Sequence, residues 1–196
     1  MTALPRSFHA RDTLEVARGL LGTLLVRDPR GRRRGGVIVE VEAYVGEADT
    51  ACHASRGRTP RNAVMYGPPG HAYVYFTYGM HWMLNVVTEA EGRPGAVLIR
   101  AIEPVEGIER IRAARPGRKE REWTSGPARL CVALEIDGRL NGTDLVEGGD
   151  LVIEPGREVP DGDVRRGPRI GIDYASPRDR RAPWRFWVEG NPHVSR

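Results

Sequence analysis

An alternating run from Val37 to Val45 constrains the fold of this chain more than any other segment. Successive side chains of a β-strand point to opposite faces of the sheet. One face of the predicted strand therefore consists of small aliphatic residues, namely Val37, Val39, Val41, Ala43 and Val45. The other face carries two carboxylates and an aromatic ring beside an isoleucine: Glu40, Glu42, Tyr44 and Ile38. The aliphatic face belongs on a hydrophobic core, whereas the second face fits either a half-solvated strand or the floor of a site.

The composition is that of a globular protein without a membrane segment. The chain has 196 residues, of which 40% are apolar and 29% charged, and it is expected to form one domain, residues 1–196, with a sizeable core. No apolar run approaches the roughly 18 residues of a membrane span, and residues 1–12 lack the apolar segment of a signal peptide. Cys52 and Cys131 are isolated, which favours a reducing, cytoplasmic location without disulfides.

Basic residues exceed acidic ones, and nearly all of them are arginine. The net charge is +4 and the pI is about 9.4, and Lys119 is the only lysine among 30 basic residues. Guanidinium groups pair with phosphates through two parallel hydrogen bonds, so the charge is compatible with a nucleic-acid partner. A genome-wide preference for arginine would give the same composition, and the charge alone does not decide the function.

The order of hairpins and short helices predicts an α+β fold. A capping-box pattern at Asp12 and Glu15 begins a helix at residues 13–21, and Gly126-Pro127 begins another that runs to Leu134. A further helix is expected at 104–114, and strands are expected at 23–27, 37–45, 71–77, 81–88, 96–102, 151–154, 169–172 and 184–188. Residues 28–36 and 47–70 are rich in turn-forming residues and are expected to be loops. These elements favour a largely antiparallel sheet surrounded by helices.

Aromatic residues are concentrated in the predicted hairpin of residues 71–88. Tyr73 and Tyr75 share a face, which fits cross-strand packing as well as a site, and Trp82 is expected to pack in the core. The tip places Tyr78 and Met80 on a protrusion. Exposed apolar side chains there are unfavourable in water, but they suit a wedge that enters a base stack.

The loop before this hairpin offers arginines for phosphate contacts. Arg56, Arg58 and Arg61 lie within six residues of one another. Such a segment is either a charged, solvated turn or part of a nucleic-acid surface, and Arg58 and Arg61 are the candidate phosphate ligands.

Several motifs, in one order, resemble the alkyladenine DNA glycosylase family, also called the 3-methyladenine or methylpurine glycosylases. They are VEVEAY from Val39 to Tyr44, CHA from Cys52 to Ala54, TPRN from Thr59 to Asn62, MYGPPGHAYVYFTYGMHWMLN from Met65 to Asn85, IRAIEP from Ile99 to Pro104 and SGPARL from Ser125 to Leu130. The resemblance covers nearly the whole chain and is densest in residues 37–135. It implies a single α+β domain with a curved, largely antiparallel sheet, surrounding helices and a protruding hairpin.

The resemblance also implies an activity and the residues that perform it. Members of the family flip a damaged purine out of duplex DNA and hydrolyse its N-glycosidic bond with water. Glu42 corresponds to the glutamate that activates this water, Arg100 to an arginine that helps to hold it, and the backbone near Ile172 to a further contact of the water site. The base-binding residues would be Tyr44, His53, Tyr75 and Asn85, and the residues that intercalate into DNA would be Tyr78 and Met80.

From this resemblance we expect a monomer that acts on double-stranded DNA containing damaged purines, without a metal or another cofactor. The expected substrates are 3-methyladenine and 7-methylguanine, and excision of hypoxanthine is left open. Because Lys119 lies in a charged connector, a Schiff-base lyase step is not expected. Spacing alone does not choose between Glu40 and Glu42, although the family motif favours Glu42 and leaves Glu40 a structural role.

Three other functions fit parts of the sequence. A glycoside hydrolase could use Glu40 and Glu42 as its carboxylate pair, since strand neighbours two apart lie about 6.6–6.8 Å from each other. A nucleic-acid binder without catalysis would have the same basic and aromatic surface. A metal hydrolase could be built on Asp49, Cys52 and His53, but the chain lacks a second ligand pair with zinc spacing.

Overall fold

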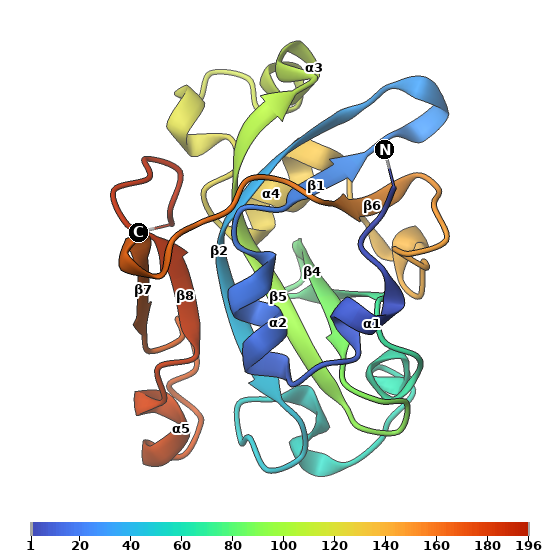
Figure 1. Cartoon of the computed structure of the whole chain (residues 1–196), viewed down its shortest axis with the longest axis vertical. Coiled ribbons are helices and arrows are strands. Elements are labelled where there is room, and N and C mark those ends of the chain that lie inside the picture. Colours follow the sequence, from blue (N-terminus) through green and yellow to red (C-terminus); the bar gives the residue numbers. More distant parts are fainter. Residues whose placement is uncertain (1, 196) are drawn as a thin grey trace.

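Eight strands pair in antiparallel fashion into one curved sheet that frames the molecule (Figure 1). The computed structural model describes residues 2–195. The strands are β1 (Leu24–Arg27), β2 (Arg34–Val45), β3 (Ala72–Thr77), β4 (His81–Thr88), β5 (Gly95–Glu106), β6 (Leu151–Glu154), β7 (Val164–Gly167) and β8 (Arg185–Val188). The helices are α1 (Arg6–His9), α2 (Thr13–Leu20), α3 (Ile108–Ala114), α4 (Pro127–Leu134) and α5 (Pro177–Arg181). The sheet and its helices confirm the predicted α+β fold.

Strand β2 is the branch point of the sheet. The strand order is β3-β4-β5-β2-β1-β6, and β8 pairs with both β2 and β7. Strand β5 takes one edge of β2 along most of its length, while β1 pairs with residues 34–37 of the other edge and β8 with residues 40–42. The sheet therefore divides at this edge, and β7 and β8 form a separate wing beside the middle of β2 (Figure 1).

Two bulges change which residues of β2 share a face. Val39 on β2 and Arg100 on β5 have no partner in the ladder between these strands. Such extra residues interrupt the alternation of side chains. From the middle of β2, the main core contains Ile38, Val41 and Ala43. The predicted aliphatic face is thus wrong for its first two members, because Val37 and Val39 pack with Ala101 in a separate cluster.

Helix α2 packs against the main core and is capped as the sequence predicts. The Asp12 carboxylate accepts hydrogen bonds from the N–H groups of Leu14 at 2.8 Å and Glu15 at 3.4 Å. Both bonds satisfy donors that have no partner within the helix. Val16 and Leu20 lie fully buried in the main core, and the helix contacts both β2 and β5.

Several predicted boundaries are wrong. β2 begins at Arg34 inside the predicted basic loop, and β5 continues through residues 104–106, where the sequence predicts a helix. Gly107 takes a left-handed φ of 61° between β5 and α3, so the helix starts only at Ile108. Residues 169–172 are not a strand, and the strand of this region is β7, at Val164–Gly167.

The hairpin of β3 and β4 protrudes from the sheet with its apolar tip in solvent. The side chains of Tyr78 and Met80 are 77% and 67% exposed, whereas Trp82 packs against the core as expected. Tyr78 takes a left-handed φ of 52°, a strained conformation for a residue with a side chain, and such strain is concentrated at functional sites. Among residues 2–195, no helix is both long and apolar enough to cross a bilayer.

Candidate functional site

A cleft of about 660 Å³ opens beside the hairpin. Its walls come from β2, the loop of residues 50–62, the hairpin, the start of α4 and the segment of residues 170–174. Glu42 and Arg100 both line it, and neither is more than 7% exposed. The cleft therefore places a carboxylate and a guanidinium group in its interior.

The Glu42 carboxylate is held by two hydrogen bonds and one ion pair from three parts of the chain. The Tyr44 hydroxyl donates to one oxygen at 3.0 Å, and the backbone N–H of Ile170 donates to the other at 2.7 Å. Nη1 of Arg100 lies 3.1 Å from the same oxygen as Ile170. Two carboxylate oxygens offer about four lone-pair positions in total, and the two hydrogen bonds leave acceptor capacity for a water molecule.

Arg100 of β5 bridges the two glutamates of β2, which lie two residues apart on that strand. Its Nε donates to Glu40 at 2.9 Å while its Nη1 faces Glu42. Burial opposes the charge of Arg100, but the carboxylates of Glu42 and Glu40 raise its pKa above the usual value. The guanidinium group is therefore a permanent cation at the floor of the cleft.

Glu40 has a structural environment that Glu42 lacks. It is 0% exposed and does not line the cleft. Besides Arg100, it accepts hydrogen bonds from Nε of Arg185 at 2.7 Å, from the N–H of Ser195 at 2.6 Å and from the Ser195 hydroxyl at 2.8 Å. With its lone pairs occupied, Glu40 is a poor partner for Glu42 in a two-carboxylate glycoside hydrolase.

Aromatic side chains form the inner wall of the cleft. Tyr44, His53 and Tyr75 line both the cleft and a small cavity of about 40 Å³ that extends it. The ring centroids of His53 and Tyr75 are 4.5 Å apart, and Nδ1 of His53 lies 2.9 Å from the hydroxyl of Tyr73. The structure thus brings together the three aromatic residues predicted for base binding.

The titrating groups of this wall are uncharged at neutral pH. Burial, together with the nearby Arg61, lowers the pKa of His53 to about 4. Burial raises the pKa of Tyr73 to about 12, and burial next to Glu42 raises that of Tyr44. The wall therefore presents neutral rings, and the hydroxyl of Tyr44 keeps the proton that it donates to Glu42.

Asn85 lies at the base of the small cavity. It is 3% exposed, and its side-chain amide donates to the backbone carbonyl of Tyr73, its ladder partner, at 3.0 Å. This bond fixes the orientation of the amide. Tyr174 also lines the small cavity, and its hydroxyl donates to the carbonyl of Ala51 at 3.0 Å. No local pattern in the sequence indicates Tyr174, because only tertiary contacts bring it to the cleft.

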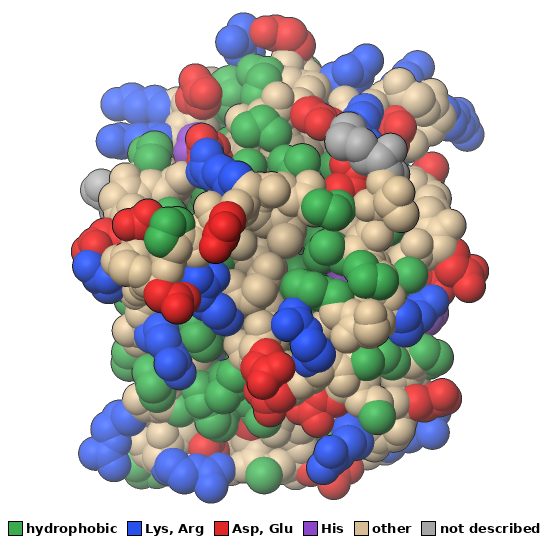
Figure 2. Space-filling view, viewed as in Figure 1, with side chains coloured by type: hydrophobic (Ala, Val, Ile, Leu, Met, Phe, Trp, Pro, Cys, Tyr) green, Lys and Arg blue, Asp and Glu red, His purple; other side chains and the backbone are tan. Residues whose placement is uncertain are grey.

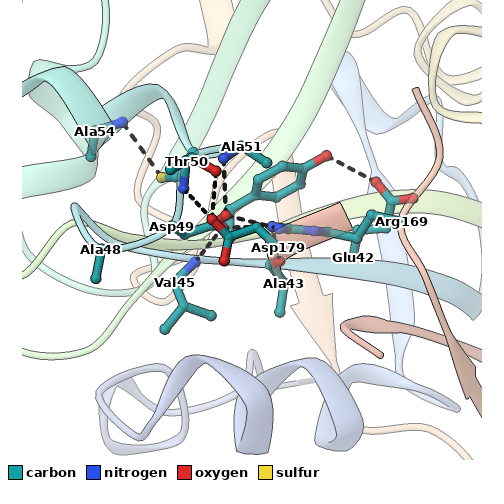
Figure 3. A network of polar contacts seen from close by, with 12 residues as sticks. Glu42, Ala43, Val45, Ala48, Asp49, Thr50, Ala51, Ala54, Arg169 and Asp179 are labelled. Atoms are coloured by element: carbon teal, nitrogen blue, oxygen red, sulfur yellow. Dashed lines mark hydrogen bonds and ion pairs between the residues drawn. The ribbon is translucent and has the colours of Figure 1, made fainter. Parts of the chain in front are cut away.

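A buried ion pair between Asp49 and Arg169 lies next to Tyr44 and Glu42 (Figure 3). Both side chains are 0% exposed, and the guanidinium group donates to the two carboxylate oxygens at 2.5 and 2.8 Å and to the carbonyl of Ala43 at 2.8 Å. It also lies over the ring of Tyr44, 4.7 Å from its centroid. Arg169 therefore packs on the ring of Tyr44 and positions the next residue, Ile170, whose N–H donates to Glu42.

The structure shifts one expected contact by two residues and argues against the alternative of a metal site. The backbone contact expected near Ile172 is made by Ile170, while Ile172 is buried against Ala51 and Ala175. Asp49, considered as a metal ligand, is taken by Arg169. Cys52 is buried, and burial raises the pKa of its thiol to about 11, so within the described residues this trio lacks the geometry and chemistry of a metal centre.

Two of the four residues predicted to contact DNA line the cleft, and Met80 and Arg58 do not. Tyr78 lines the cleft, and Met80 follows it at the hairpin tip. Arg61 also lines the cleft and donates to the carbonyl of Phe76 at 3.1 Å. Arg58 does not line the cleft, and its guanidinium group lies 5.8 Å from the ring centroid of Tyr66.

Comparison with known proteins reveals close relatives over the whole chain. The family model described as methylpurine-DNA glycosylase (MPG) matches residues 7–192. A protein of Methanocella arvoryzae is 53% identical over 100% of this chain and 97% of its own. Proteins of Carboxydothermus hydrogenoformans and Myxococcus xanthus are 53% and 52% identical, over 98% and 100% of this chain and 98% and 95% of theirs. All three are named "Putative 3-methyladenine DNA glycosylase".

Proposed function

Because the chain belongs to the methylpurine-DNA glycosylase family, we propose that it excises 3-methyladenine and 7-methylguanine from duplex DNA as a monofunctional glycosylase. The observation that carries this proposal is the buried Glu42 carboxylate, held by two hydrogen bonds and an ion pair in a cleft lined with aromatic rings. Hydrolysis would release the free base and leave an abasic site. Family membership supports the repair of alkylated bases, and the steps below are our proposal for this chain.

Glu42 would act as the general base. A water molecule donates a hydrogen bond to its free acceptor position and attacks C1′ of the deoxyribose. As the C1′–N bond breaks, the water proton passes to Glu42 and the bonding electrons leave with the base. A positioned general base contributes about 10²–10⁴-fold to the rate. The negative charge of Glu42 also stabilises the positive charge that develops on the sugar, and Arg100 holds the carboxylate in place.

The aromatic wall would select the damaged base. Methylation at N3 or N7 makes the purine cationic, and the faces of aromatic rings attract cations. A protonated His53 would repel such a base, but at neutral pH the imidazole is uncharged because its pKa is lowered to about 4. We propose that Tyr44 stacks on one side of the base and His53 with Tyr75 on the other, while Asn85 contacts its edge.

The hairpin tip would hold the duplex open. Flipping a base costs a few kcal/mol of unstacking, less when the base is damaged. Tyr78 would fill the vacated space with Met80 beside it, and Arg61, which lines the cleft, would contact backbone phosphate. The structure leaves Lys119 outside the cleft-lining residues, which favours water over an amine as the nucleophile.

Excision assays test this proposal. The protein is incubated, with EDTA present, with duplexes that contain 3-methyladenine, 7-methylguanine or hypoxanthine, and alkali-cleavable abasic sites are scored. We expect cleavage at the two methylated purines, and slower cleavage at hypoxanthine because its leaving group is neutral. DNA binding without any abasic product would refute the proposal in favour of a non-catalytic binder. Gel filtration would test the expected monomer.

A further inference from the structure

A second groove, with a volume of about 840 Å³, lies at the end of β2 farthest from Tyr44. Its walls are the β1–β2 connection, helix α3 and the residue that caps the C-terminus of α4. Six arginines line it: Arg27, Arg30, Arg32, Arg34, Arg110 and Arg139. In Figure 1, α3 and the β1–β2 connection stand together at the upper end of the molecule, and Figure 2 shows basic side chains along this edge.

Half of these arginines are neutralised by the protein. Arg27 pairs with Asp150 at 3.0 Å and Arg34 with Glu135 at 2.8 Å, and both arginines are buried at the floor of the groove. Arg139 pairs with Asp137 at 2.7 Å. Within residues 2–195, the Nε atoms of Arg27 and Arg34 are buried without an acceptor and are out of reach of a ligand, so binding would depend on the exposed arginines.

The other three arginines carry the unbalanced charge. Arg30, Arg32 and Arg110 are exposed, and among the residues that the structure describes none of them has a carboxylate partner. They project from two separate elements, the β1–β2 connection and α3. Guanidinium groups spread in this way suit a row of phosphates better than one small anion.

Helix α4 connects this groove to the cleft. Pro127 at its start lines the cleft, and Glu135 at its C-terminal cap lines the arginine groove. Between them lies a shallower hollow of about 320 Å³, lined by Val132 of α4 and by Met80 at the hairpin tip. Eight helical residues at a rise of about 1.5 Å span about 12 Å, which matches the axial length of about four base pairs of B-DNA.

We propose that the arginine groove binds backbone phosphates of the substrate duplex on one flank of the lesion, a few base pairs beyond the hairpin. The inference rests on the proposed function, since it assumes that DNA occupies the cleft. It predicts an asymmetry, because only one flank of the duplex runs along α4. Shortening that flank removes phosphates that the groove would bind, whereas shortening the opposite flank leaves them in place.

The test uses an uncleavable abasic-site analogue placed near one end, near the other end, or in the centre of otherwise identical duplexes. Affinity is measured by fluorescence anisotropy over a range of salt concentrations. The groove variant is Arg30→Ala/Arg32→Ala/Arg110→Ala. The matched control is Arg11→Ala/Arg18→Ala/Arg166→Ala, which removes the same charge from a hollow of about 640 Å³ along α2.

We expect the wild-type protein and the control variant to bind more weakly when one particular flank is shortened. The groove variant should bind the long duplex more weakly and should not respond to that flank. Its slope of log K against log salt should be shallower by about 0.9 for each phosphate that the protein no longer neutralises. If each of the three arginines neutralises one phosphate, the slope should change by about 2.7.

Three outcomes would overturn the proposal: equal sensitivity to both flanks in the wild-type protein, identical behaviour of the groove and control variants, or an unaltered salt slope in the groove variant. Thermal stabilisation of the wild-type protein by pyrophosphate, absent in the groove variant and without any flank effect, would assign the groove to a small anion instead. Excision of 3-methyladenine by the wild-type protein is scored separately. Excision activity without flank asymmetry would refute only phosphate binding by the arginine groove. Absence of excision activity would refute the proposed function.

Discussion

The substitution Glu42→Gln should remove most of the excision rate while leaving the fold and DNA binding largely intact. The amide has the size of the carboxylate and keeps one acceptor oxygen for the N–H of Ile170, now at 2.7 Å. Its NH₂ group would face the Tyr44 hydroxyl, which lies 3.0 Å from Glu42 and can rotate to accept a hydrogen bond. An amide does not take a proton from water, so the general base is lost.

The expected magnitudes follow from these contacts. Loss of a general base lowers the rate by about 10²–10⁴-fold, which corresponds to about 3–5 kcal/mol of transition-state stabilisation. Stability should change less, because Arg100 keeps the Glu40 carboxylate at 2.9 Å as its counter-charge. One weakened buried hydrogen-bond network costs about 1–3 kcal/mol, or a fall in Tm of about 2–12 °C for a domain of this size.

Glu40→Gln is the matched control, since it is the same change two residues away on the same strand. Glu40 is 0% exposed and compensates two guanidinium groups, those of Arg100 and Arg185. Removing one partner of a buried ion pair costs about 3–5 kcal/mol, so Tm should fall by about 6–20 °C. The two variants should therefore separate chemistry from folding.

The assay is single-turnover excision from a 3-methyladenine duplex with the enzyme in excess, combined with anisotropy binding and thermal melting. A Glu42→Gln rate within tenfold of wild type would refute the catalytic assignment. The assignment would also be refuted if Glu40→Gln had the same Tm as Glu42→Gln and lost as much of the excision rate. The two glutamates would then be equivalent.

Three further predictions concern the tip, the support and the pH response. Tyr78→Ser should leave Tm unchanged, because this side chain is 77% exposed, and should lower the fluorescence change of a base analogue beside the lesion; an unchanged signal would exclude the wedge. Asp49→Asn leaves Arg169 buried without its counter-charge and should lower the free energy of unfolding by about 3–5 kcal/mol, as measured by urea unfolding. It should also slow excision, because Arg169 precedes Ile170. A free energy of unfolding within about 1 kcal/mol of wild type, well below that range, would contradict the role of the pair. Burial lowers the pKa of His9 and His53 to about 4, whereas an unfolded histidine titrates near about 6.5. The unfolded state therefore binds more protons below about pH 6.5, and stability should fall as the pH drops from about 6.5 to 4; His53→Gln should weaken this dependence, and an unaltered profile would show that His53 does not contribute.

Short-range patterns predicted the elements that build the site. The alternation around Glu42 indicates a strand, Asp12 indicates a helix start, and the residues Tyr78-Gly79-Met80 indicate a hairpin tip. Each of these signals depends on neighbours within a few residues, because the period of a regular strand or helix places nearby side chains on one face; the bulge at Val39 interrupts that period and was not predicted. The family motifs then indicated which of the two glutamates to favour.

The arrangement of charges around that strand was beyond such patterns. The contacts of Arg100 with both glutamates depend on how β2 and β5 align, and no local pattern indicates that alignment or its bulges at Val39 and Arg100. Likewise, Asp49 and Arg169 are 120 positions apart in the chain, and nothing in either local segment indicates the other.

Local sequence thus specified a strand with carboxylates, an aromatic hairpin and the chemistry available to them. Tertiary structure alone decided that Glu40 accepts four hydrogen bonds away from the cleft, whereas Glu42 lines the cleft and accepts only two. The physical reason is that hydrogen-bond saturation depends on groups brought together by strand pairing and by the C-terminal segment, not on spacing along the chain.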